Sequence, residues 1–406
     1  MIIFNEKLRP EVNIGTVGHV DHGKTSLVYA MTGKWTSEHS EELKRGITIR
    51  LGYADTVFYY CEKCKSYTTS KKCPVCFGDT EPKRAVSFVD APGHETLMAT
   101  VLSGTALMDG ALLLVAANEK CPLPQTAEHL KALDIAGIKN IVIVQNKIDI
   151  VSDERALQSY QEIKKFVAGT VAENAPIVPI SAIHNTNIDA LIEAIETYIP
   201  TPKRDVDTDP VFYVARSFDV NKPGTEIETL KGGVIGGSLV AGKLSVGDVI
   251  EIKPGIKVNN EWKPLDTKIV EVVQSKHDTD TAHPGGLLAI QTDMDPSVTK
   301  SDSLSGDIAG LKGKIPPVVD EIKCAVTLFD YVIGTEGNAK IEHIRTGDVL
   351  MLTAAIAKTV GTVTSAAKDN ATIKLRLPVV AKNGDRVSIS KQVGGRWHLI
   401  GYGVIQ

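Results

Sequence analysis

The sequence predicts three parts: an α/β domain with a parallel sheet, followed by two small all-β barrel domains. In the first half, short apolar runs alternate with amphipathic helical segments, which is typical of parallel strands covered by helices on both faces. Beyond residue 210 the helical period nearly disappears, and short β-branched segments separated by glycine indicate barrels. A chain of 406 residues is long enough for several domains.

The expected elements of the first part follow one another along the chain. Strands are expected at residues 12–17, 85–89, 111–116, 141–144 and 177–180. Helices are expected from residue 24 onward and at residues 95–107, 126–136, 153–167 and 188–198. A proline-rich linker at 200–210 and a second break at 310–321 separate the parts. The predicted domains are therefore residues 1–203, 204–325 and 326–406.

The charge balance limits the classes of partner. The chain carries 45 basic and 49 acidic residues, a net charge of -4, which excludes a protein that coats nucleic acid by bulk charge. Residues 326–406 carry ten basic and six acidic residues, so any contact with an RNA backbone is expected to be local. We find no apolar run of membrane-spanning length and no secretory signal, and we expect a cytoplasmic protein without a membrane partner.

Four of the six cysteines form a regular pattern. Cys61, Cys64, Cys73 and Cys76 read as two C-x2-C pairs separated by eight residues, the spacing of a tetrahedral thiolate zinc site. Two disulfides are the alternative, which is disfavoured without a secretory signal. The segment 61–76 is polar and too short to bury a core, so zinc would stabilise this knuckle. Four thiolates leave no open coordination position, which indicates a structural metal.

The segment GHVDHGKT, from Gly18 to Thr25, fits the phosphate-loop pattern G-x4-G-K-[ST] between a strand and a helix. Its backbone N–H groups would bind phosphates at the N-terminus of a helix. Lys24 would reach the β- and γ-phosphates, and the Thr25 hydroxyl would bind Mg²⁺. The sequence therefore predicts a P-loop nucleotide site.

Three more motifs follow expected strands in the order that such a site requires. In DAPGH, Asp90 would bind Mg²⁺ through water and the Gly93 N–H would sense the γ-phosphate. In NKID, the Asp149 carboxylate would accept two hydrogen bonds from guanine, a donor pair that adenine lacks, so the nucleotide is GTP or GDP. The segment SAI would close over the base. The predicted nucleotide-binding residues are Gly18, Asp21, His22, Gly23, Lys24, Thr25, Ser26, Gly93, Asn146, Lys147, Asp149, Ser181, Ala182 and Ile183.

These motifs, together with RGITI at residues 45–49, resemble the translational GTPases of the elongation factor Tu class. A narrower resemblance covers essentially the whole chain. GKWTSEHSEELKRGITI, the four-cysteine knuckle, AVSFVDAPGHETLMATVLSG, ARSFDVNKPGT and GGRWHLIGYG are similar to the gamma subunit of archaeal translation initiation factor 2. The knuckle between RGITI and the DAPGH strand is the most discriminating feature. The fold class is thus a P-loop GTPase domain with a zinc knuckle insertion and two all-β barrel domains.

The resemblance implies roles for further residues. Thr48 matches the switch threonine that binds Mg²⁺ and the γ-phosphate, and His94 matches the histidine that positions the attacking water. Val20 and Ile47 match the apolar gate for that histidine. Asp21, with the backbone around Gly46, matches a second Mg²⁺ site, although Asp21 could equally brace the loop. The implied set is catalytic His94, Thr48 and Lys24, and magnesium ligands Thr25, Thr48, Asp90, Asp21 and Gly46.

The resemblance also implies a function. A GTPase of this family carries methionylated initiator tRNA to the small ribosomal subunit and works with an alpha and a beta subunit. We find no obvious arginine finger in the sequence, so hydrolysis is expected to be slow until another factor completes the site. The alternatives are an elongator or selenocysteine-specific tRNA carrier and the GTPase subunit of sulfate adenylyltransferase. The cysteine knuckle argues against all three.

Overall fold

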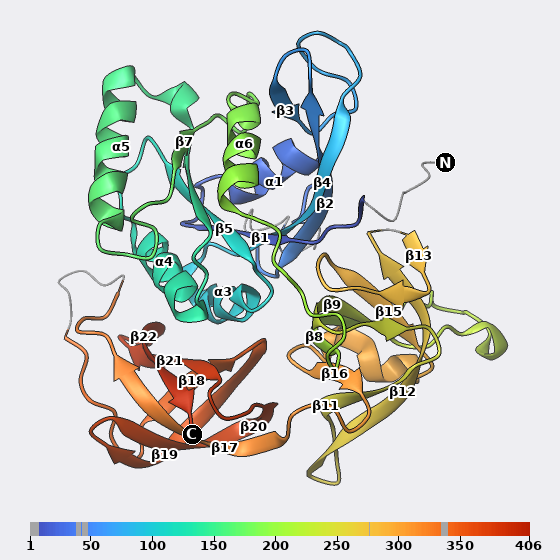
Figure 1. Cartoon of the computed structure of the whole chain (residues 1–406). Helices are drawn as coiled ribbons and strands as arrows, with labels where there is room; N and C mark the ends of the chain where they lie inside the picture. Colours follow the sequence, from blue (N-terminus) through green and yellow to red (C-terminus); the bar gives the residue numbers. More distant parts are fainter. Residues whose placement is uncertain (1–7, 38–41, 43–47, 276, 334–339) are drawn as a thin grey trace. The chain divides into compact units, whose positions relative to one another are not determined.

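The structure is a computed structural model that describes residues 8–37, 42, 48–275, 277–333 and 340–406. The chain forms two compact units (Figure 1). The first contains Met1–Pro202, Phe329–Ile341 and Val393–Ile400, and the second contains Lys203–Leu328, Glu342–Gln392 and Gly401–Gln406. The long segment of the first unit ends inside the predicted proline-rich linker.

The first unit contains a seven-stranded sheet in the order β3-β2-β4-β1-β5-β6-β7. Its strands are β1 (Asn13–Gly18), β2 (Gly52–Cys61), β3 (Ser66–Thr68), β4 (Glu81–Asp90), β5 (Gly110–Ala116), β6 (Ile141–Asn146) and β7 (Ile177–Pro179). Strands β4, β1, β5, β6 and β7 are parallel, as expected. The sheet is mixed and not parallel throughout, because β2, which the sequence did not predict, pairs antiparallel with both β4 and β3. Strand β2 lacks the continuous buried run of the central strands, since most of its residues are only half-buried.

The helices of the first unit are α1 (Lys24–Thr32), α3 (Met98–Thr105), α4 (Pro124–Ala136), α5 (Asp153–Val167) and α6 (Ile188–Tyr198). The expected helix at 95–107 is divided into a short 3-10 turn, η2 (Glu95–Leu97), and α3. Helix α5 begins where the Ser152 hydroxyl accepts the Arg155 N–H, and its acidic first turn and basic last turn suit the helix dipole. Helices α1 and α6 share one buried apolar cluster with the sheet. The sheet is thereby held rigid beneath the loops that carry the motifs.

Strands β8 to β16 build the first barrel. Six of them close it through the β11–β12 pairing: β8 (Val211–Phe218), β9 (Val234–Ala241), β11 (Val249–Val258), β12 (Glu261–Gln274), β15 (Leu288–Thr292) and β16 (Ile308–Leu311). Three short strands are attached: β10 (Leu244–Ser245), β13 (His277–Thr279) and β14 (Thr281–Ala282). Besides η2, the described residues include the short 3-10 turns η3 (Ile148–Ile150), η4 (Ile227–Thr229) and η5 (Pro296–Asp302). The barrel has its own apolar core, which includes Phe212, Ile235 and Ile290.

A second closed barrel has the strand order β17-β20-β19-β18-β21-β22. Its strands are β17 (Val318–Leu328), β18 (Val349–Ala354), β19 (Ala357–Ala367), β20 (Asn370–Val380), β21 (Arg386–Val393) and β22 (Arg396–Ile405). This barrel begins at Val318, whereas the expected domain began at residue 326, inside β17. The difference arises because β17 begins inside the predicted break at 310–321 and runs through 326 without interruption.

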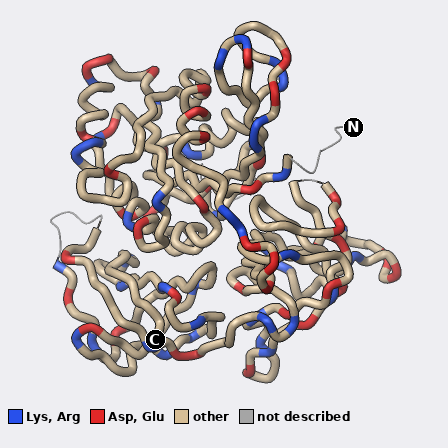
Figure 2. The backbone as a smooth tube through the Cα atoms, in the orientation of Figure 1, with Lys and Arg blue, Asp and Glu red and all other residues tan. Residues whose placement is uncertain are grey.

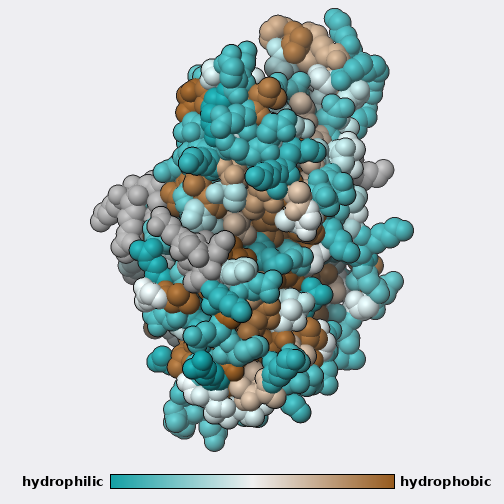
Figure 3. All heavy atoms as spheres, turned by 90° about the vertical axis from the view of Figure 1, so that its left-hand side faces the viewer, coloured by the Kyte–Doolittle hydropathy of each residue, from teal (hydrophilic) through white to brown (hydrophobic). Residues whose placement is uncertain are grey.

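Two surface properties bear on function. Lysine and arginine are interspersed with aspartate and glutamate along the chain rather than gathered in one stripe (Figure 2). On the face shown in Figure 3, apolar side chains alternate with polar ones. Within the described ranges, every helix is too short or too polar to cross a membrane.

Candidate nucleotide and zinc sites

The phosphate loop connects β1 to α1 and depends on glycine. Gly18 and Gly23 have φ of +139° and +88°, a region that side chains disfavour. A side chain at Gly23 would also collide with the Asn146 amide. Asp21 adopts φ +61°, so the loop turns sharply at this position too. The loop can therefore bring its backbone close to a bound phosphate group.

Lys24 is buried at the first turn of α1. Its Nζ donates to the carbonyl oxygens of Gly18, at 3.0 Å, and His19, at 2.6 Å. Burial lowers the pKa of Lys24 to about 8, against the opposing charges of Asp90 and Asp21. The ammonium is therefore mostly protonated at neutral pH and available to an anion.

The predicted magnesium ligands Thr25, Thr48 and Asp90 lie together. The Thr25 hydroxyl donates to Asp90 Oδ2 at 2.8 Å and lies 3.0 Å from the Thr48 hydroxyl. These three residues come from α1, from the segment before β2, and from the end of β4. An oxygen cluster of this kind fits a hard cation such as Mg²⁺.

A cavity of about 510 Å³ opens beside this cluster. Its lining contains the predicted residues Val20, Asp21, Gly23, Lys24, Thr25, Ser26, Thr48, Gly93, Lys147 and Ile183. A Cβ atom at Gly93 would lie 2.9 Å from the backbone nitrogen of Val20 and would also meet Lys24 Nζ, so glycine allows this close approach to the phosphate loop. The structure thus brings most of the predicted phosphate-binding residues to one cavity.

The base-recognition motifs are joined by hydrogen bonds. Asn146 donates through Nδ2 to the His22 carbonyl at 2.9 Å and accepts the Ala182 N–H at 3.1 Å. It thereby ties the phosphate loop to the SAI loop. The Ser181 hydroxyl is the main cause of a lowered pKa at Asp149, which keeps that carboxylate ionised. An ionised acceptor is what the two guanine donors require.

Some predicted residues are placed differently from expectation. The His22 side chain is turned away from the cavity, with Nδ1 2.8 Å from the Leu114 carbonyl oxygen and Nε2 3.3 Å from Glu119. Its contribution to the phosphate loop is therefore made by the main chain, whose carbonyl oxygen accepts the Asn146 amide. His94 is not among the residues that line the cavity, and its Nδ1 lies 2.9 Å from the Thr96 hydroxyl. Gly46 and Ile47 lie outside the described residues.

Several residues at the site belong to none of the predicted motifs. The hydroxyls of Thr16 and Thr36 both donate to Asp90, and Ser37 and Glu42 line the cavity. The Gly18 N–H donates to His129 Nδ1 on α4 at 2.8 Å. All these contacts join residues far apart or in irregular segments, and we find no local sequence signal that could have identified them.

The four knuckle cysteines fit a zinc ion. Their sulfur atoms all lie within 4.8 Å of one another, with Cys61 to Cys76 at 3.5 Å and Cys64 to Cys73 at 3.7 Å. Four thiolates around one zinc at ~2.3 Å would be separated by about 3.8 Å. Main-chain N–H groups of Cys76 and Val75 lower the pKa of Cys73, which favours a thiolate there, whereas a hydrogen bond with Cys76 raises the pKa of Cys64. These residues would hold zinc as a structural ion.

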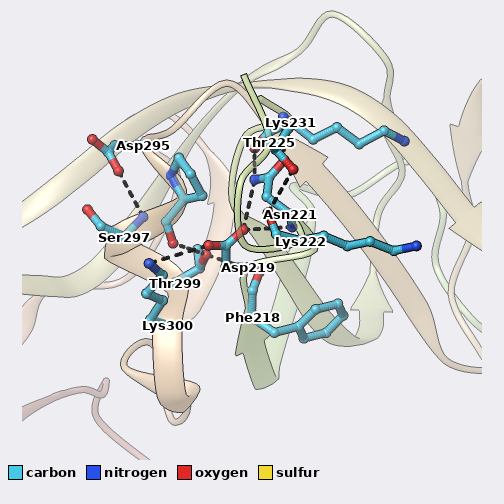
Figure 4. Close-up of polar contacts among 11 residues, drawn as sticks. Phe218, Asp219, Asn221, Lys222, Thr225, Lys231, Asp295, Ser297, Thr299 and Lys300 are labelled. Atoms are coloured by element: carbon cyan, nitrogen blue, oxygen red, sulfur yellow. Dashed lines mark hydrogen bonds and ion pairs between the residues drawn. The ribbon is translucent and has the colours of Figure 1, made fainter. Parts of the chain in front are cut away.

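In the first barrel, the sequence ARSFDVNKPG at residues 215–224 covers the end of β8 and the loop that follows it (Figure 4). Asp219 accepts the backbone and side-chain N–H groups of Asn221, each at 2.8 Å, and lies 3.5 Å from Lys300 Nζ. Asn221 in turn exchanges two hydrogen bonds with the backbone of Lys231. The ends of the loop are therefore fastened, while Lys222 points outward in Figure 4.

This chain is similar to known proteins both domain by domain and over nearly its full length. Residues 9–201 match the elongation factor Tu GTP binding domain, and residues 320–405 match the initiation factor eIF2 gamma C-terminal domain. Translation initiation factor 2 subunit gamma of Methanocaldococcus jannaschii is 59% identical over 98% of this chain and 97% of its own length. The chain belongs to this family of archaeal initiation factor gamma subunits. The Pyrococcus abyssi and Archaeoglobus fulgidus proteins of the same name are 55% and 58% identical. The gamma-subunit resemblance is confirmed, and the chain is a member of a GTPase family.

Solved structures share the fold at low identity. The bacterial selenocysteine-specific elongation factor EF-Sec superposes with a TM-score of 0.75 at 22% identity, over 98% of this chain and 58% of that protein. The elongation factor SelB from Methanococcus maripaludis in complex with a GTP analogue superposes with a TM-score of 0.73 at 21% identity, over 99% and 80%. These likenesses support the fold of this gamma subunit, while the high-identity relatives favour initiation over the selenocysteine alternative.

Proposed function

We propose that this gamma subunit, in its GTP-bound state, carries methionylated initiator tRNA to the small ribosomal subunit, and that GTP hydrolysis releases the tRNA. The observation that best supports the switch is the convergence of Thr25, Thr48 and Asp90. A magnesium ion bound to a γ-phosphate would hold these three separate segments together, and loss of the phosphate would free Thr48. One phosphate group would then control tRNA affinity.

The residues would divide the chemistry as follows. Lys24 would bind the β- and γ-phosphates, and Thr25, Thr48 and Asp90 would hold Mg²⁺, which neutralises phosphate charge. His94 would position the attacking water after turning away from Thr96, with Val20 and Ile47 as its apolar gate. None of the described residues that line the cavity is an arginine. We therefore propose slow hydrolysis until another factor completes the site.

The remaining assignments extend this proposal. Asp21, which lines the cavity, and the backbone near Gly46 would hold a second Mg²⁺. The factor would act in the cytoplasm together with an alpha and a beta subunit. The predicted limits 1–203, 204–325 and 326–406 are proposed as the functional domains, with the boundary between the two barrels moved back to just before Val318.

The loop of the first barrel is proposed as part of the tRNA contact. Phe218, Val220, Ile227 and Leu230 all expose apolar side chains, Ile227 by 84%. Lys222 lies on the same loop. Exposed apolar side chains can stack on the bases at the end of an RNA strand, and a nearby cation can contact its phosphates.

A binding competition tests the function. The chain with a GTP analogue, with and without candidate partner subunits, is titrated with initiator and elongator methionyl-tRNA, and protection of the methionyl ester is measured. We expect tighter binding and stronger protection of initiator tRNA, and both should be lost with GDP. Lys222→Glu should weaken tRNA binding about tenfold, on the scale of one desolvated charge contact, without changing nucleotide affinity. Equal affinities for both tRNAs would exclude the initiator-specific function.

A further inference from the structure

Glu42 is an acidic residue buried at the nucleotide cavity. Its exposed fraction is only 2%, and it lines the cavity that also contains Lys24 and Thr48. A carboxylate buried to this extent needs hydrogen-bond donors to offset the loss of water. Its Oε1 accepts the backbone N–H groups of Ile49, at 2.9 Å, and Arg50, at 3.0 Å.

These two donors directly follow Thr48 in the chain. The Thr48 hydroxyl lies 2.9 Å from the Ser37 hydroxyl and 3.0 Å from that of Thr25. Thr48 is therefore held in two ways: its side chain by Ser37 and Thr25, and its following backbone by Glu42. Thr48 cannot leave the Thr25–Asp90 cluster without breaking these hydrogen bonds.

We infer that Glu42 is a positioning residue that holds the Thr48 segment in its triphosphate-binding place, and that Ser37 assists it. This inference rests on the proposed function of Thr48 as a magnesium ligand in the GTP state. Glu42 acts through the main chain after Thr48 and needs no contact with the nucleotide. Because a diphosphate offers Thr48 no γ-phosphate, the hydrogen bonds of Glu42 strengthen triphosphate binding selectively.

Nucleotide binding by the full chain tests this inference. Affinities for GDP and for a non-hydrolysable GTP analogue are measured with Mg²⁺ for the wild type, Glu42→Ala, Glu42→Gln and Ser37→Ala. Glu42→Ala should weaken the analogue about tenfold or more, the scale of one lost charge-assisted hydrogen bond, and GDP by less than about twofold. Glu42→Gln keeps an acceptor oxygen without the charge, so its loss should be intermediate.

The matched control is Glu173→Ala, an exposed glutamate in the same unit, which should leave both affinities unchanged. Retained GDP affinity also shows that each variant is folded. An equal loss for GDP and the analogue, or full affinity in Glu42→Ala, would overturn the inference. A Glu42→Gln variant as weak as Glu42→Ala for the analogue alone would support the inference and show that the two hydrogen bonds depend on the carboxylate charge. The proposed tRNA function fails separately, if the wild type binds initiator tRNA equally with either nucleotide.

Discussion

At the residue scale, the Asp90 carboxylate organises the site. Its two oxygens accept hydroxyl donors from Thr16, Thr25 and Thr36, at 2.8, 2.8 and 2.6 Å. Asp90 is fully buried at the end of β4, so these donors replace the water that an ionised carboxylate requires. The acid is thus held in one orientation before any cation arrives, which lowers the reorganisation needed for metal binding.

A substitution at Asp149 tests the choice of base. Asp149→Asn should lower GTP affinity by ~100-fold or more, because the new amide places a donor against the guanine donors and leaves them unpaired. The variant should prefer a xanthine nucleotide, whose carbonyl oxygen at C2 accepts that donor. Competition binding with both nucleotides measures the change. Asp207→Asn, in an exposed stretch of the linker, is the control, and unchanged base preference in Asp149→Asn would contradict the assignment.

The second residue prediction concerns acid stability at His129. His129 is fully buried, and its Nδ1 can accept the Gly18 N–H only when it is unprotonated. Burial, and then the nearby Lys24, His19 and His22, lower the pKa of His129 well below its ordinary value near 6.5. The unfolded chain therefore binds this proton more readily, so the stabilisation is complete above about pH 6.5 and is lost at ~1.4 kcal/mol per pH unit below it.

Urea unfolding at pH 7.5, 6.5 and 5.5 measures this effect. His129→Gln keeps an acceptor but does not titrate, so its unfolding free energy should fall less steeply on acidification than that of the wild type. His343→Gln, at an exposed histidine, should follow the wild type. Parallel curves for His129→Gln and the wild type would show that His129 is not the acid-sensitive group.

The motif residues could be predicted because each motif is short and local. Lys24, Asp90 and Asn146 lie in contiguous patterns at strand ends, where parallel sheets place ligands. Glu42 and His129 could not be predicted, because their roles depend on contacts with backbone groups of other segments. The direction of the His22 side chain could not be predicted either, because a motif specifies residue types and not side-chain rotamers.

At the element scale, the knuckle extends the sheet beyond the nucleotide site. Strands β2 and β4 pair from Gly52 with Asp90 to Tyr60 with Glu81, and the cysteines lie beyond the Tyr60 end. The strands β2 and β3 were missed because most of their residues are only half-buried, as in a surface segment. Helices α5 and α6 were predicted with their observed bounds, because each combines a strong apolar period with clear start signals.

Removal of zinc should loosen the knuckle and spare the nucleotide site. Cys73→Ser with Cys76→Ser removes half of the thiolates, so we expect loss of bound zinc and rapid proteolysis between residues 61 and 80. Asp90 lies at the other end of a ten-residue strand, about 30 Å from Glu81 at ~3.3 Å per residue. Nucleotide affinity should therefore change by less than about twofold, on the scale expected for independent sites.

Metal analysis and limited proteolysis followed by mass spectrometry measure these outcomes. Cys121→Ser is the matched control, because Cys121 lies outside the cluster and should leave the zinc content unchanged. Full zinc content in the double variant would disprove the four-thiolate site. A large loss of nucleotide affinity would show instead that the knuckle supports the sheet as far as Asp90.

At the scale of the whole molecule, the cores of the first unit and of the first barrel share none of the buried residues that the structure describes. One core lies between the sheet and helices α1 and α6, and another fills the first barrel. The separation could be predicted because the apolar period changes at the linker. Closure of the second barrel could not, since β17 and β22 lie far apart in the sequence and their pairing depends on how the sheet curls.

Separate cores predict that two similar substitutions will have different functional effects. Phe212→Ala in the barrel core and Phe88→Ala in the core beneath the nucleotide site each remove a fully buried ring, at a cost of ~3–5 kcal/mol of unfolding free energy. Phe88 lies two residues before Asp90 on β4, so Phe88→Ala should also weaken nucleotide binding. Phe212→Ala should leave nucleotide affinity unchanged and reduce tRNA binding. Calorimetry and nucleotide titration of both variants separate the effects, and an equal loss of nucleotide affinity would show that the cores are energetically coupled.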